Sequence, residues 1–470
     1  MSVPYSEELA PDFASFMKNS KRLYSLNAEG KIAAMYPVGA GGIAEAVTKM
    51  AFGNRIGIKI ENIPYSATKI GENQKHSSSE HDFFTPLYGS IIVEANQKLS
   101  ASDFEDGTFF ILGKTISEPE IFVSVAGIEE CRVSLCEAEE SWEGRLKSVF
   151  PSVSSFSQGE KLPDFAKKIH SSLSEIRKNP VFVNSGAKPR VVIPVFPGTN
   201  CEFDMARAFD LAGAETRILV LANRTPEMLS RSLSEFSKEL KDANILALAG
   251  GFSAGDEPDG SAKFIANCLR EGRIADEIMN LLKKRDGLVL GICNGFQALV
   301  KTGLAIYGEI RDMKSDMPTL TYNRIGRHVS RIVRTRMVSA SSPWALDPSV
   351  VDLRIHLVPV SHGEGRFVCD EETAERLFEN GQVFSQYADE FGNPTLLEPD
   401  NPNGSCYAIE GLTSPDGRVL GKMGHSERTL GKALNGASID LIKNIAGNPL
   451  LNEYENSCQN IFAAGVRYFK

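Results

Sequence analysis

The residue with the clearest chemical potential is Cys293, which ends an apolar run and lies between Gly291 and Gly295. A nucleophile flanked in this way by glycines two residues before and after it is typical of a sharp turn from a strand into a helix. The N-terminus of the following helix would favour the thiolate, which is the nucleophilic form of cysteine. The alternative is a core residue, since unpaired cysteine is often buried. The spacing favours a cysteine nucleophile.

A cysteine that attacks a carbonyl group also needs hydrogen-bond donors for the oxyanion that forms. The segment Ala-Gly-Gly-Phe-Ser at 249–253 offers backbone N–H groups that a substrate can approach closely, because its paired glycines have no side chain. We expect the N–H groups of Gly251 and Asn294 to share this charge. An ordinary glycine turn would have the same sequence.

The general base is less clear, because two histidines are each followed two residues later by a glutamate. These pairs are His362 with Glu364 and His425 with Glu427. Residues two apart in an extended segment face the same side, so either glutamate could orient its histidine and support the imidazolium. The first pair lies in a glycine-rich segment, which is typical of a loop that meets a ligand or another domain. The second follows a predicted hairpin with its turn at 414–417. Spacing alone does not choose between them.

The elements that must position these residues alternate regularly from residue 189 onward. Apolar strands are predicted at 191–196, 217–221, 244–249 and 287–292, with helices between them at 200–212, 225–240 and 261–284. Strands that are apolar on both faces and separated by helices indicate an α/β fold with a doubly wound, mostly parallel sheet. Active sites in such sheets lie at the carboxyl ends of the strands, and Cys293 follows one of these ends.

We expect three parts in the chain: a smaller α+β domain at 1–150, a linker at 151–188 and the doubly wound domain at 189–470. The first part contains strand-like runs at 32–35, 56–60, 90–94 and 108–112 together with one or two helices. The linker is rich in serine, lysine and proline, with a short predicted helix around 164–176.

Composition excludes several classes of protein. With 470 residues, 42% hydrophobic content and a formal net charge of −9, the chain predicts a globular protein without a general nucleic-acid partner. No stretch has the apolar length of a membrane span, and the acidic N-terminus lacks the apolar core of a signal peptide. The eight cysteines and seven histidines show neither a disulfide framework nor a metal signature. We therefore expect a cytoplasmic protein without a metal site or membrane partner.

Five segments together form a specific pattern. They are Phe-Pro-Gly-Thr-Asn-Cys-Glu-Phe-Asp (196–204), Ala-Gly-Gly-Phe-Ser-Ala-Gly-Asp-Glu-Pro-Asp-Gly (249–260), Gly-Ile-Cys-Asn-Gly-Phe-Gln (291–297), Ser-His-Gly-Glu-Gly-Arg-Phe (361–367) and Gly-His-Ser-Glu-Arg (424–428). With them, the chain from 191 to 470 resembles the glutaminase domain of phosphoribosylformylglycinamidine synthase. That domain is a class I glutamine amidotransferase with a flavodoxin-like fold.

The resemblance implies a catalytic triad of Cys293, His425 and Glu427. It also implies that Gln297 helps to hold the substrate glutamine, and it places Phe252 in the substrate-binding loop. Many amidotransferases have a proline before the triad histidine, whereas this chain has glycine at 424. This departure puts the rigidity of the loop in doubt rather than its chemistry.

The same resemblance leaves His362 and Glu364 as candidates for a domain interface or a substrate loop. It also bears on residues 1–150, which resemble the C-terminal domain of aminoimidazole ribonucleotide synthetase, a fold shared with the synthetase part of the same enzyme. The other synthetase domains are absent from this sequence. In the complete enzyme those domains carry ATP and Mg²⁺, so we expect no cofactor in this chain and a synthetase partner on the same or another polypeptide.

A rival interpretation of the N-terminal part is a dinucleotide-binding fingerprint. Gly39, Gly41 and Ala44 have its spacing, and Glu61 lies about where a ribose contact is expected. No further strand–helix units follow to complete such a domain, and one short match is weak. We therefore favour the synthetase-like interpretation.

The sequence thus predicts a glutaminase that releases ammonia for ATP-dependent conversion of formylglycinamide ribonucleotide to formylglycinamidine ribonucleotide in purine biosynthesis. Two alternatives stay open. One is a stand-alone cysteine hydrolase of the γ-glutamyl hydrolase or peptidase type. The other is a regulatory or assembly subunit whose triad does not turn over.

Overall fold

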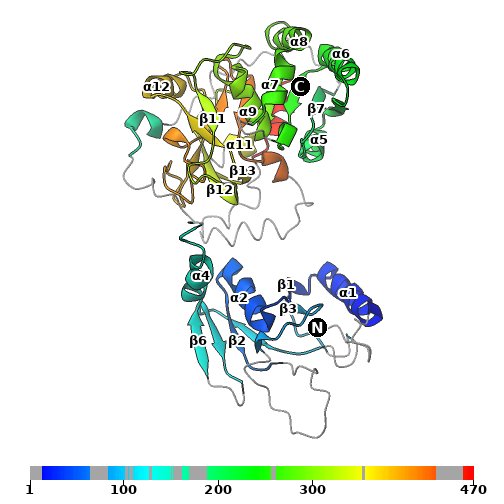
Figure 1. Ribbon diagram of the computed structural model, residues 1–470, viewed down its shortest axis with the longest axis vertical. Helices are drawn as coiled ribbons and strands as arrows, with labels where there is room; N and C mark the ends of the chain where they lie inside the picture. Colours follow the sequence, from blue (N-terminus) through cyan, green and yellow to red (C-terminus); the bar gives the residue numbers. More distant parts are fainter. Residues whose placement is uncertain are drawn as a thin grey trace. The chain divides into compact units, whose positions relative to one another are not determined.

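The computed structural model describes residues 13–63, 83–100, 104, 109–125, 130–149, 151, 161–168, 188–255, 261–351, 355–429 and 459–470. Figure 1 shows its elements. The chain divides into two compact units, Met1–Ser152 and Val153–Lys470. Most of the predicted linker, including the end of its helix beyond residue 168, lies outside the described residues. The described start of that helix is a 3₁₀ turn, η2 (Asp164–Lys167).

The N-terminal unit combines small sheets with helices. Its elements are α1 (Phe13–Ala28), β1 (Ile32–Pro37), α2 (Gly42–Asn54), β2 (Gly57–Ile60), β3 (Ile91–Ala95), β4 (Gly113–Ile116), β5 (Glu120–Val123), β6 (Cys131–Ser134) and α4 (Leu135–Gly144). Strands β1 and β3 form one antiparallel pair, and a second sheet has the order β4-β2-β5-β6. Residues of α2 and the strands share a core that includes Val47, Ile60 and Ile121.

Three of the four predicted strands in this unit are present, as β1, β2 and β3. The fourth, at 108–112, is wrong for residues 109–112, and Thr108 lies outside the described residues. Phe110 and Ile111 are 49% and 54% exposed, and the chain enters a strand only at Gly113. Only Leu112 of this run packs against the core of the unit, so hydrophobicity alone misplaced the strand.

The topology of this unit argues against dinucleotide binding. In a dinucleotide-binding fold, the strand before the glycine-rich turn and the strand after the following helix lie parallel in one sheet. Here these two strands, β1 and β2, lie in different sheets. In addition, the Glu45 carboxylate accepts a hydrogen bond from the N–H of Gly41 at 2.8 Å. The carboxylate thus places negative charge in the turn that would have to receive a pyrophosphate.

The C-terminal unit is built on one large sheet. Its main elements are β7 (Arg190–Val195), α5 (Glu202–Leu211), β8 (Glu215–Val220), α6 (Pro226–Asp242), β9 (Ile245–Leu248), α7 (Lys263–Arg270), α8 (Gly272–Lys283), β10 (Leu288–Ile292), α9 (Asn294–Lys301), α10 (Leu304–Tyr307), β12 (Val329–Met337), β13 (Ile355–His362), α12 (Glu371–Glu379), β15 (Val383–Ala388), β16 (Ile409–Thr413), β17 (Val419–Lys422) and α14 (Ile461–Arg467). Shorter strands β11 (Thr319–Thr321) and β14 (Arg366–Val368) form a separate pair, and α11 (Pro348–Val351) is a single turn.

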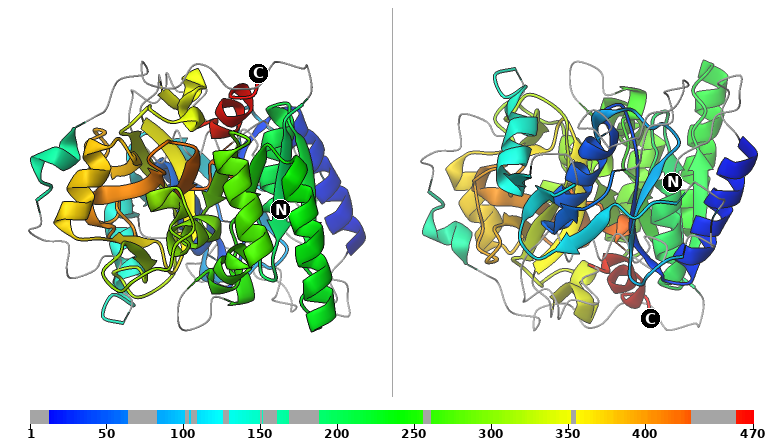
Figure 2. Two further views of the ribbon diagram at one scale, coloured as in Figure 1. Left: turned by 90° about the horizontal axis from the view of Figure 1, so that it is seen from above. Right: turned by 90° about the horizontal axis from the view of Figure 1, so that it is seen from below.

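The sheet has nine strands in the order β13-β12-β15-β16-β17-β10-β9-β7-β8. Pairings from β17 through β10, β9 and β7 to β8 are parallel, whereas those from β13 to β17 are antiparallel. In Figures 1 and 2 the green elements and the yellow to orange elements of this unit lie side by side. The predicted α/β fold is confirmed, with an antiparallel extension that the sequence pattern did not distinguish.

Local sequence signals account for most of the parallel half. Strands β9 and β10 are buried at every residue, as expected for strands covered on both faces. Helix α6 begins with Pro226 after Thr225, whose hydroxyl accepts a hydrogen bond from the N–H of Met228 at 3.2 Å. The predicted hairpin is present as β16 and β17, and Gly417 has the positive φ of 73° that its turn requires.

The long helix predicted at 261–284 is wrong in one respect, because it is two helices. Glu271 has ψ 129°, which is outside the helical region, and it separates α7 from α8. Its carboxylate accepts from the N–H of Ile274 at 3.2 Å and so caps the second helix. The step from Leu269 to Ile274, the next buried apolar residue, is five residues instead of three or four, so the apolar period shifts at this break and the single predicted helix overlooked it. Among the described residues, no helix combines the length and apolar character needed to cross a membrane.

Candidate active site

Cys293 occupies the sharp turn between β10 and α9. Its φ of 52° and ψ of −105° are strained for a residue other than glycine. Neither flanking glycine leaves room for a side chain. A Cβ at Gly291 would lie 2.7 Å from the carbonyl oxygen of Gly295, and a Cβ at Gly295 would lie 2.1 Å from the carbonyl oxygen of Leu248. The turn therefore has the form that the sequence predicted for a nucleophile.

The pair His425 and Glu427 forms a direct hydrogen bond close to this thiol. Nδ1 of His425 lies 2.6 Å from Oε1 of Glu427, and both side chains are buried. The segment is a 3₁₀ turn, η7 (Ser426–Arg428), rather than the extended stretch assumed for the two-residue spacing. The bond nevertheless forms, because the turn brings the glutamate back toward the ring.

The neighbours of His425 favour its charged form. Burial alone disfavours the imidazolium, but the attraction of Glu427 and hydrogen bonds with the thiols of Cys201 and Cys293 outweigh it. The pKa of His425 is therefore raised well above its ordinary value of 6.5. An imidazolium beside a cysteine stabilises the thiolate, so this arrangement suits nucleophilic catalysis.

The predicted oxyanion donors lie at two chain turns near Cys293. Asn294 is the first residue of α9, where backbone N–H groups point out of the helix. Gly251 follows β9, has φ 148° and forms a bridge with Thr199. The described residues provide no hydrogen-bond acceptor for the Gly251 N–H. The neighbouring N–H of Phe252 is engaged instead, with the carbonyl oxygen of Gly198 at 2.8 Å.

Gln297 and Phe252 differ in their surroundings. Gln297 is buried in α9, where its Oε1 accepts from Nδ2 of Asn294 at 2.8 Å and its Nε2 donates to the carbonyl oxygen of Glu364. Phe252 is 38% exposed, and its ring centroid lies 5.9 Å from that of His328. Gln297 therefore ties α9 to the 361–367 segment, while Phe252 lies at the surface of the loop after β9.

The second pair, His362 and Glu364, is also buried but forms no direct bond. Nδ1 of His362 lies 3.1 Å from Oδ1 of Asn323, and Oε2 of Glu364 accepts from the N–H of Ser261 at 2.7 Å. Burial first, and then the positive charge of His425, lower the pKa of His362 to about 3. This histidine is therefore neutral at physiological pH. Its segment still borders the site, since the carbonyl oxygen of Ser361 lies 3.7 Å from Sγ of Cys293.

A fully buried ion pair supports the segment that carries His425. Nζ of Lys422 lies 3.3 Å from Oε1 of Glu410, and neither side chain has exposed surface. Lys422 also donates to the carbonyl oxygen of Gly424 and to Oγ of Ser426, each at 3.0 Å. The N–H of Gly424 donates to Glu410 at 2.6 Å. We refer to these contacts as the Lys422–Glu410 clamp.

The clamp explains the glycine that stands before His425. A proline at position 424 has no N–H to donate to Glu410. A Cβ at this position would also lie 2.9 Å from Oε1 of Glu410 and 3.1 Å from Nζ of Lys422. The loop is thus held by hydrogen bonds to a buried ion pair, and a proline ring is incompatible with them.

Sequence reasoning missed Cys201 and Arg428 as neighbours of the predicted triad. One Nη of Arg428 lies 3.4 Å from Sγ of Cys201, and ligand atoms of Cys201, His425 and Glu427 lie within 4.8 Å of one another. The Arg428 guanidinium opposes a further cation at this cluster, and Nδ1 of His425 is already bonded to Glu427. Both missed residues lie in the quoted 196–204 and 424–428 segments, which was the only available signal.

Gly250 was a second omission. A Cβ at Gly250 would lie 2.7 Å from Cε1 of His425, 3.2 Å from Sγ of Cys201 and 3.4 Å from Cβ of Cys293. The absence of a side chain here allows the histidine and the two thiols to meet. The first of the paired glycines is therefore a packing requirement of the site.

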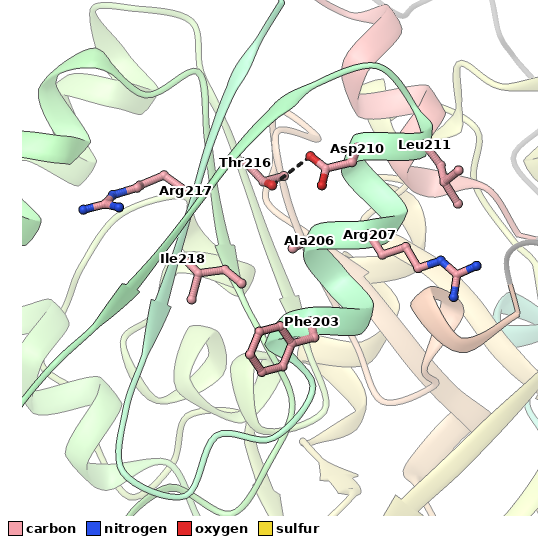
Figure 3. Close-up of a pocket in the computed structure, with 8 residues that line it drawn as sticks. All are labelled: Phe203, Ala206, Arg207, Asp210, Leu211, Thr216, Arg217 and Ile218. Carbon is pink, nitrogen blue, oxygen red and sulfur yellow. Dashed lines mark hydrogen bonds between the residues drawn. The ribbon is translucent and has the colours of Figure 1, made fainter. Parts of the chain in front are cut away.

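A surface pocket of about 660 Å³ lies away from these residues, between α5 and β8 (Figure 3). Its lining includes Phe203, Arg207 and Arg217, and the figure shows the two arginines pointing in different directions. Oγ1 of Thr216 donates to Asp210 at 2.8 Å within it. None of the predicted site residues contributes to its lining.

Comparison with known proteins gives the family. Residues 188–469 match the family model of the CobB/CobQ-like glutamine amidotransferase domain. The phosphoribosylformylglycinamidine synthase subunit PurQ of Methanococcus maripaludis strain C7 is 35% identical over 286 residues, which are 60% of this chain and 97% of that protein. The PurQ subunit of Treponema denticola is 35% identical over 257 residues, covering 52% of this chain and 89% of the relative.

Among solved structures, the PurLQS structure from Thermotoga maritima aligns over 60% of this chain and 100% of its own, with 24% identity and a TM-score of 0.41. The family assignment rests on the family model and the sequence relatives, which cover the residues that surround Cys293. From residue 188 onward the chain belongs to the CobB/CobQ-like glutamine amidotransferases, in the branch of the PurQ subunits of phosphoribosylformylglycinamidine synthase.

Proposed function

We propose that the chain hydrolyses glutamine through a thioester on Cys293 and supplies the ammonia to a synthetase site. The observation that carries this proposal is the convergence of a strained cysteine turn with the hydrogen-bonded pair of His425 and Glu427. A thiolate, an imidazolium and an orienting carboxylate are the groups that acyl transfer from an amide requires.

The reaction begins with attack of the Cys293 thiolate on the side-chain amide carbon of glutamine. The N–H groups of Gly251 and Asn294 stabilise the oxyanion, and loss of one such donor typically costs about 10²–10³-fold in kcat. His425 protonates the amide nitrogen, the carbon–nitrogen bond breaks, ammonia leaves and a γ-glutamyl thioester remains. His425 then takes a proton from water, which attacks the thioester and releases glutamate, while Glu427 keeps the imidazole oriented throughout.

Gln297, Phe252, His362 and Glu364 form the surroundings of the substrate in this proposal. The hydrogen bond from Gln297 to the main chain of Glu364 fixes the 361–367 segment relative to α9. Phe252 covers one side from the loop after β9. These residues hold glutamine in place, and the triad performs the chemistry.

The ammonia is used in the ATP- and Mg²⁺-dependent conversion of formylglycinamide ribonucleotide to formylglycinamidine ribonucleotide in purine biosynthesis, in the cytoplasm. The PurQ names of the relatives and the PurLQS title of the Thermotoga maritima structure support a synthetase partner. Residues 1–150 contribute a synthetase-like domain to that assembly. Ammonia released into neutral water would be mostly protonated and non-nucleophilic, so coupling the two sites has a chemical purpose.

The test is release of glutamate from free glutamine by the purified full-length chain, with and without one equivalent of a glutamine analogue that alkylates thiols. We expect turnover that the analogue blocks, with the label on Cys293. Cys293→Ala should lose both turnover and labelling. Cys268→Ala, which alters a buried cysteine of α7 outside the site, is the matched control and should keep both.

The other outcomes separate the alternatives. Labelling of Cys293 without turnover would favour a site that requires its synthetase partner, and addition of that partner should then start turnover. Faster hydrolysis of γ-glutamyl peptides than of glutamine would favour a stand-alone hydrolase. Ammonia release that persists in Cys293→Ala would overturn the mechanism.

A further inference from the structure

Cys369 and Cys406 form a close pair of thiols outside the triad. Their sulfur atoms lie 3.7 Å apart although the residues are 37 positions apart in the chain. Cys369 follows β14, and Cys406 begins the 3₁₀ turn η6 (Cys406–Ala408). Both residues are partly exposed and also pack against the core of the unit. The proposed glutaminase mechanism uses neither thiol.

The pair joins two segments that are otherwise connected by hydrogen bonds. The N–H of Phe367 donates to Oγ of Ser405 at 3.0 Å. Nδ2 of Asn403 donates to the carbonyl oxygen of Gly365 at 2.7 Å. The bonds hold the backbone of 365–367 against 403–405, so the two sulfur atoms are already placed side by side in the folded chain.

The two thiols have different electrostatic character. A hydrogen bond from the Cys369 thiol, with a further contribution from the positive charge of Arg366, outweighs burial and lowers the pKa of Cys406. The same hydrogen bond, together with burial, raises the pKa of Cys369. The thiol with the lower pKa is the one that attacks an oxidant more readily, and a second thiol beside it can resolve the product.

We propose that Cys369 and Cys406 are a redox modification site that forms a reversible intramolecular disulfide. The sulfur atoms must approach from 3.7 Å to about 2.05 Å, the length of a disulfide bond. The oxidant is a small disulfide such as glutathione disulfide. No part of this proposal depends on the glutaminase assignment.

The exchange balances in two steps. The Cys406 thiolate attacks one sulfur of glutathione disulfide, forming a mixed disulfide and expelling one glutathione thiolate. Cys369 then loses its proton to solvent and attacks the Cys406 sulfur, expelling the second glutathione as a thiolate. Two protein thiols are oxidised, and one glutathione disulfide is reduced to two thiols.

The bond would fix a segment that borders the catalytic cysteine. Residues 361–367 lead from Ser361, which lies next to Cys293, to the strand that Cys369 follows, and Gln297 contacts the same segment at Glu364. Oxidation therefore adds a covalent link to the hydrogen bonds between the two segments without consuming the nucleophile.

The test equilibrates the full-length chain in glutathione buffers of increasing oxidised fraction, then alkylates free thiols and maps peptides by mass spectrometry. The experiment is run on the natural sequence and on Cys293→Ala, so that mixed disulfides at the nucleophile do not confuse the result. We expect a Cys369–Cys406 linked peptide that dithiothreitol removes. The exposed Cys131 and Cys136 serve as internal controls and should carry separate glutathione adducts.

Two near-isosteric variants keep the test decisive. Cys369→Ser should trap a glutathione adduct on Cys406, whereas Cys406→Ser should leave Cys369 largely unmodified. The oxidised natural chain should also have a Tm several degrees higher than the reduced one, since closing a long loop restricts the unfolded state. The proposal is overturned if Cys131 becomes modified while Cys369 and Cys406 both stay free, or if both carry glutathione without linking.

Discussion

In one of the two His-x-Glu pairs, Nδ1 of His425 lies 2.6 Å from a Glu427 carboxylate oxygen. In the other, Nδ1 of His362 is 3.1 Å from Asn323, and Glu364 accepts a hydrogen bond from the backbone instead. Both pairs are buried and both border Cys293. The neighbours around each pair therefore decide what the histidine can do, because the spacing in the sequence is the same.

The difference is largest in charge. The pKa of His425 is raised well above 6.5, since Glu427 and the two thiols outweigh burial. The pKa of His362 falls to about 3 through burial and the repulsion of the nearby His425 charge. The imidazolium form is therefore favoured for His425, which lies beside Cys293, and disfavoured for His362. This contrast leads to five predictions.

The largest expected effect comes from removing each histidine in turn. His425→Ala should lower the rate of glutamate release by about 10⁴-fold or more, as loss of a triad member does in related chemistry. His362→Ala should leave thioester formation largely intact, because its imidazole is not bonded to Cys293 or Glu427. Single-turnover trapping of the thioester measures both. The opposite ranking would mean that the wrong pair has been assigned to the triad.

The second prediction concerns the Lys422–Glu410 clamp, which supports only the His425 pair. Lys422→Met leaves the Glu410 carboxylate buried without its partner, and should reduce the free energy of unfolding by about 3–5 kcal/mol. Denaturant titration measures this loss. The control is Lys283→Met on the exposed surface of α8, for which little change is expected.

A double variant distinguishes a broken ion pair from a simple packing defect. Lys422→Met combined with Glu410→Gln removes both charges, so part of the lost stability should return. If the double variant is as unstable as the sum of the two single variants, charge pairing does not account for the effect of the clamp.

The third prediction uses a matched pair of glycines. In Gly250→Ala the new methyl group would lie 2.7 Å from the His425 ring, and displacing the ring should cost about 10²-fold in kcat. Gly363→Ala alters the middle residue of the other pair, where a Cβ meets no atom within 4 Å, and should have little effect. Steady-state kinetics compare the two. Equal rates for both variants would contradict the tight contact at Gly250.

The smallest effect is a difference in titration, measured by nitrogen NMR of histidine-labelled protein. His425 should keep its proton up to a pH above 6.5. His362 should bind a proton only when the pH falls to about 3. Glu427→Gln should lower the His425 value. Unchanged titration in that variant would remove Glu427 as the cause.

These two shifts affect stability with opposite signs. The raised pKa of His425 contributes stability that is fully present below pH 6.5 and is lost as pH rises through the raised value. The depressed pKa of His362 contributes stability that is present above pH 6.5 and is lost as pH falls toward 3. Unfolding measured across this range in His362→Gln should show less acid destabilisation than the natural sequence.

Local sequence patterns predicted the structure correctly where the residues that determine it are neighbours in the chain. The glycines around Cys293 predicted the turn, and Thr225 with Pro226 marked the start of α6. Two local patterns gave wrong boundaries. Phe110 and Ile111 are apolar but exposed, and the step of five residues from Leu269 to Ile274, which marks the helix break, was overlooked.

The site shows the same division. Resemblance to a family was needed to choose His425, because spacing could not separate two equal pairs. Cys201 and the Lys422–Glu410 clamp were missed, since their partners come from other segments of the chain. The contact between Cys369 and Cys406 was also invisible in the sequence, where the cysteines are scattered.

The sequence by itself determined the strained turn at Cys293 and the alternation of buried strands with helices, because backbone sterics and hydrophobic period act over a few residues. Only the tertiary structure decided which histidine has the raised pKa, which thiols meet and which contacts hold Gly424 before His425. Those properties depend on desolvation and on distances between segments far apart in the chain. Hydrogen-bond partners such as Glu427, Asn323 and Glu410 are assigned only when the sheet brings their strands and loops together.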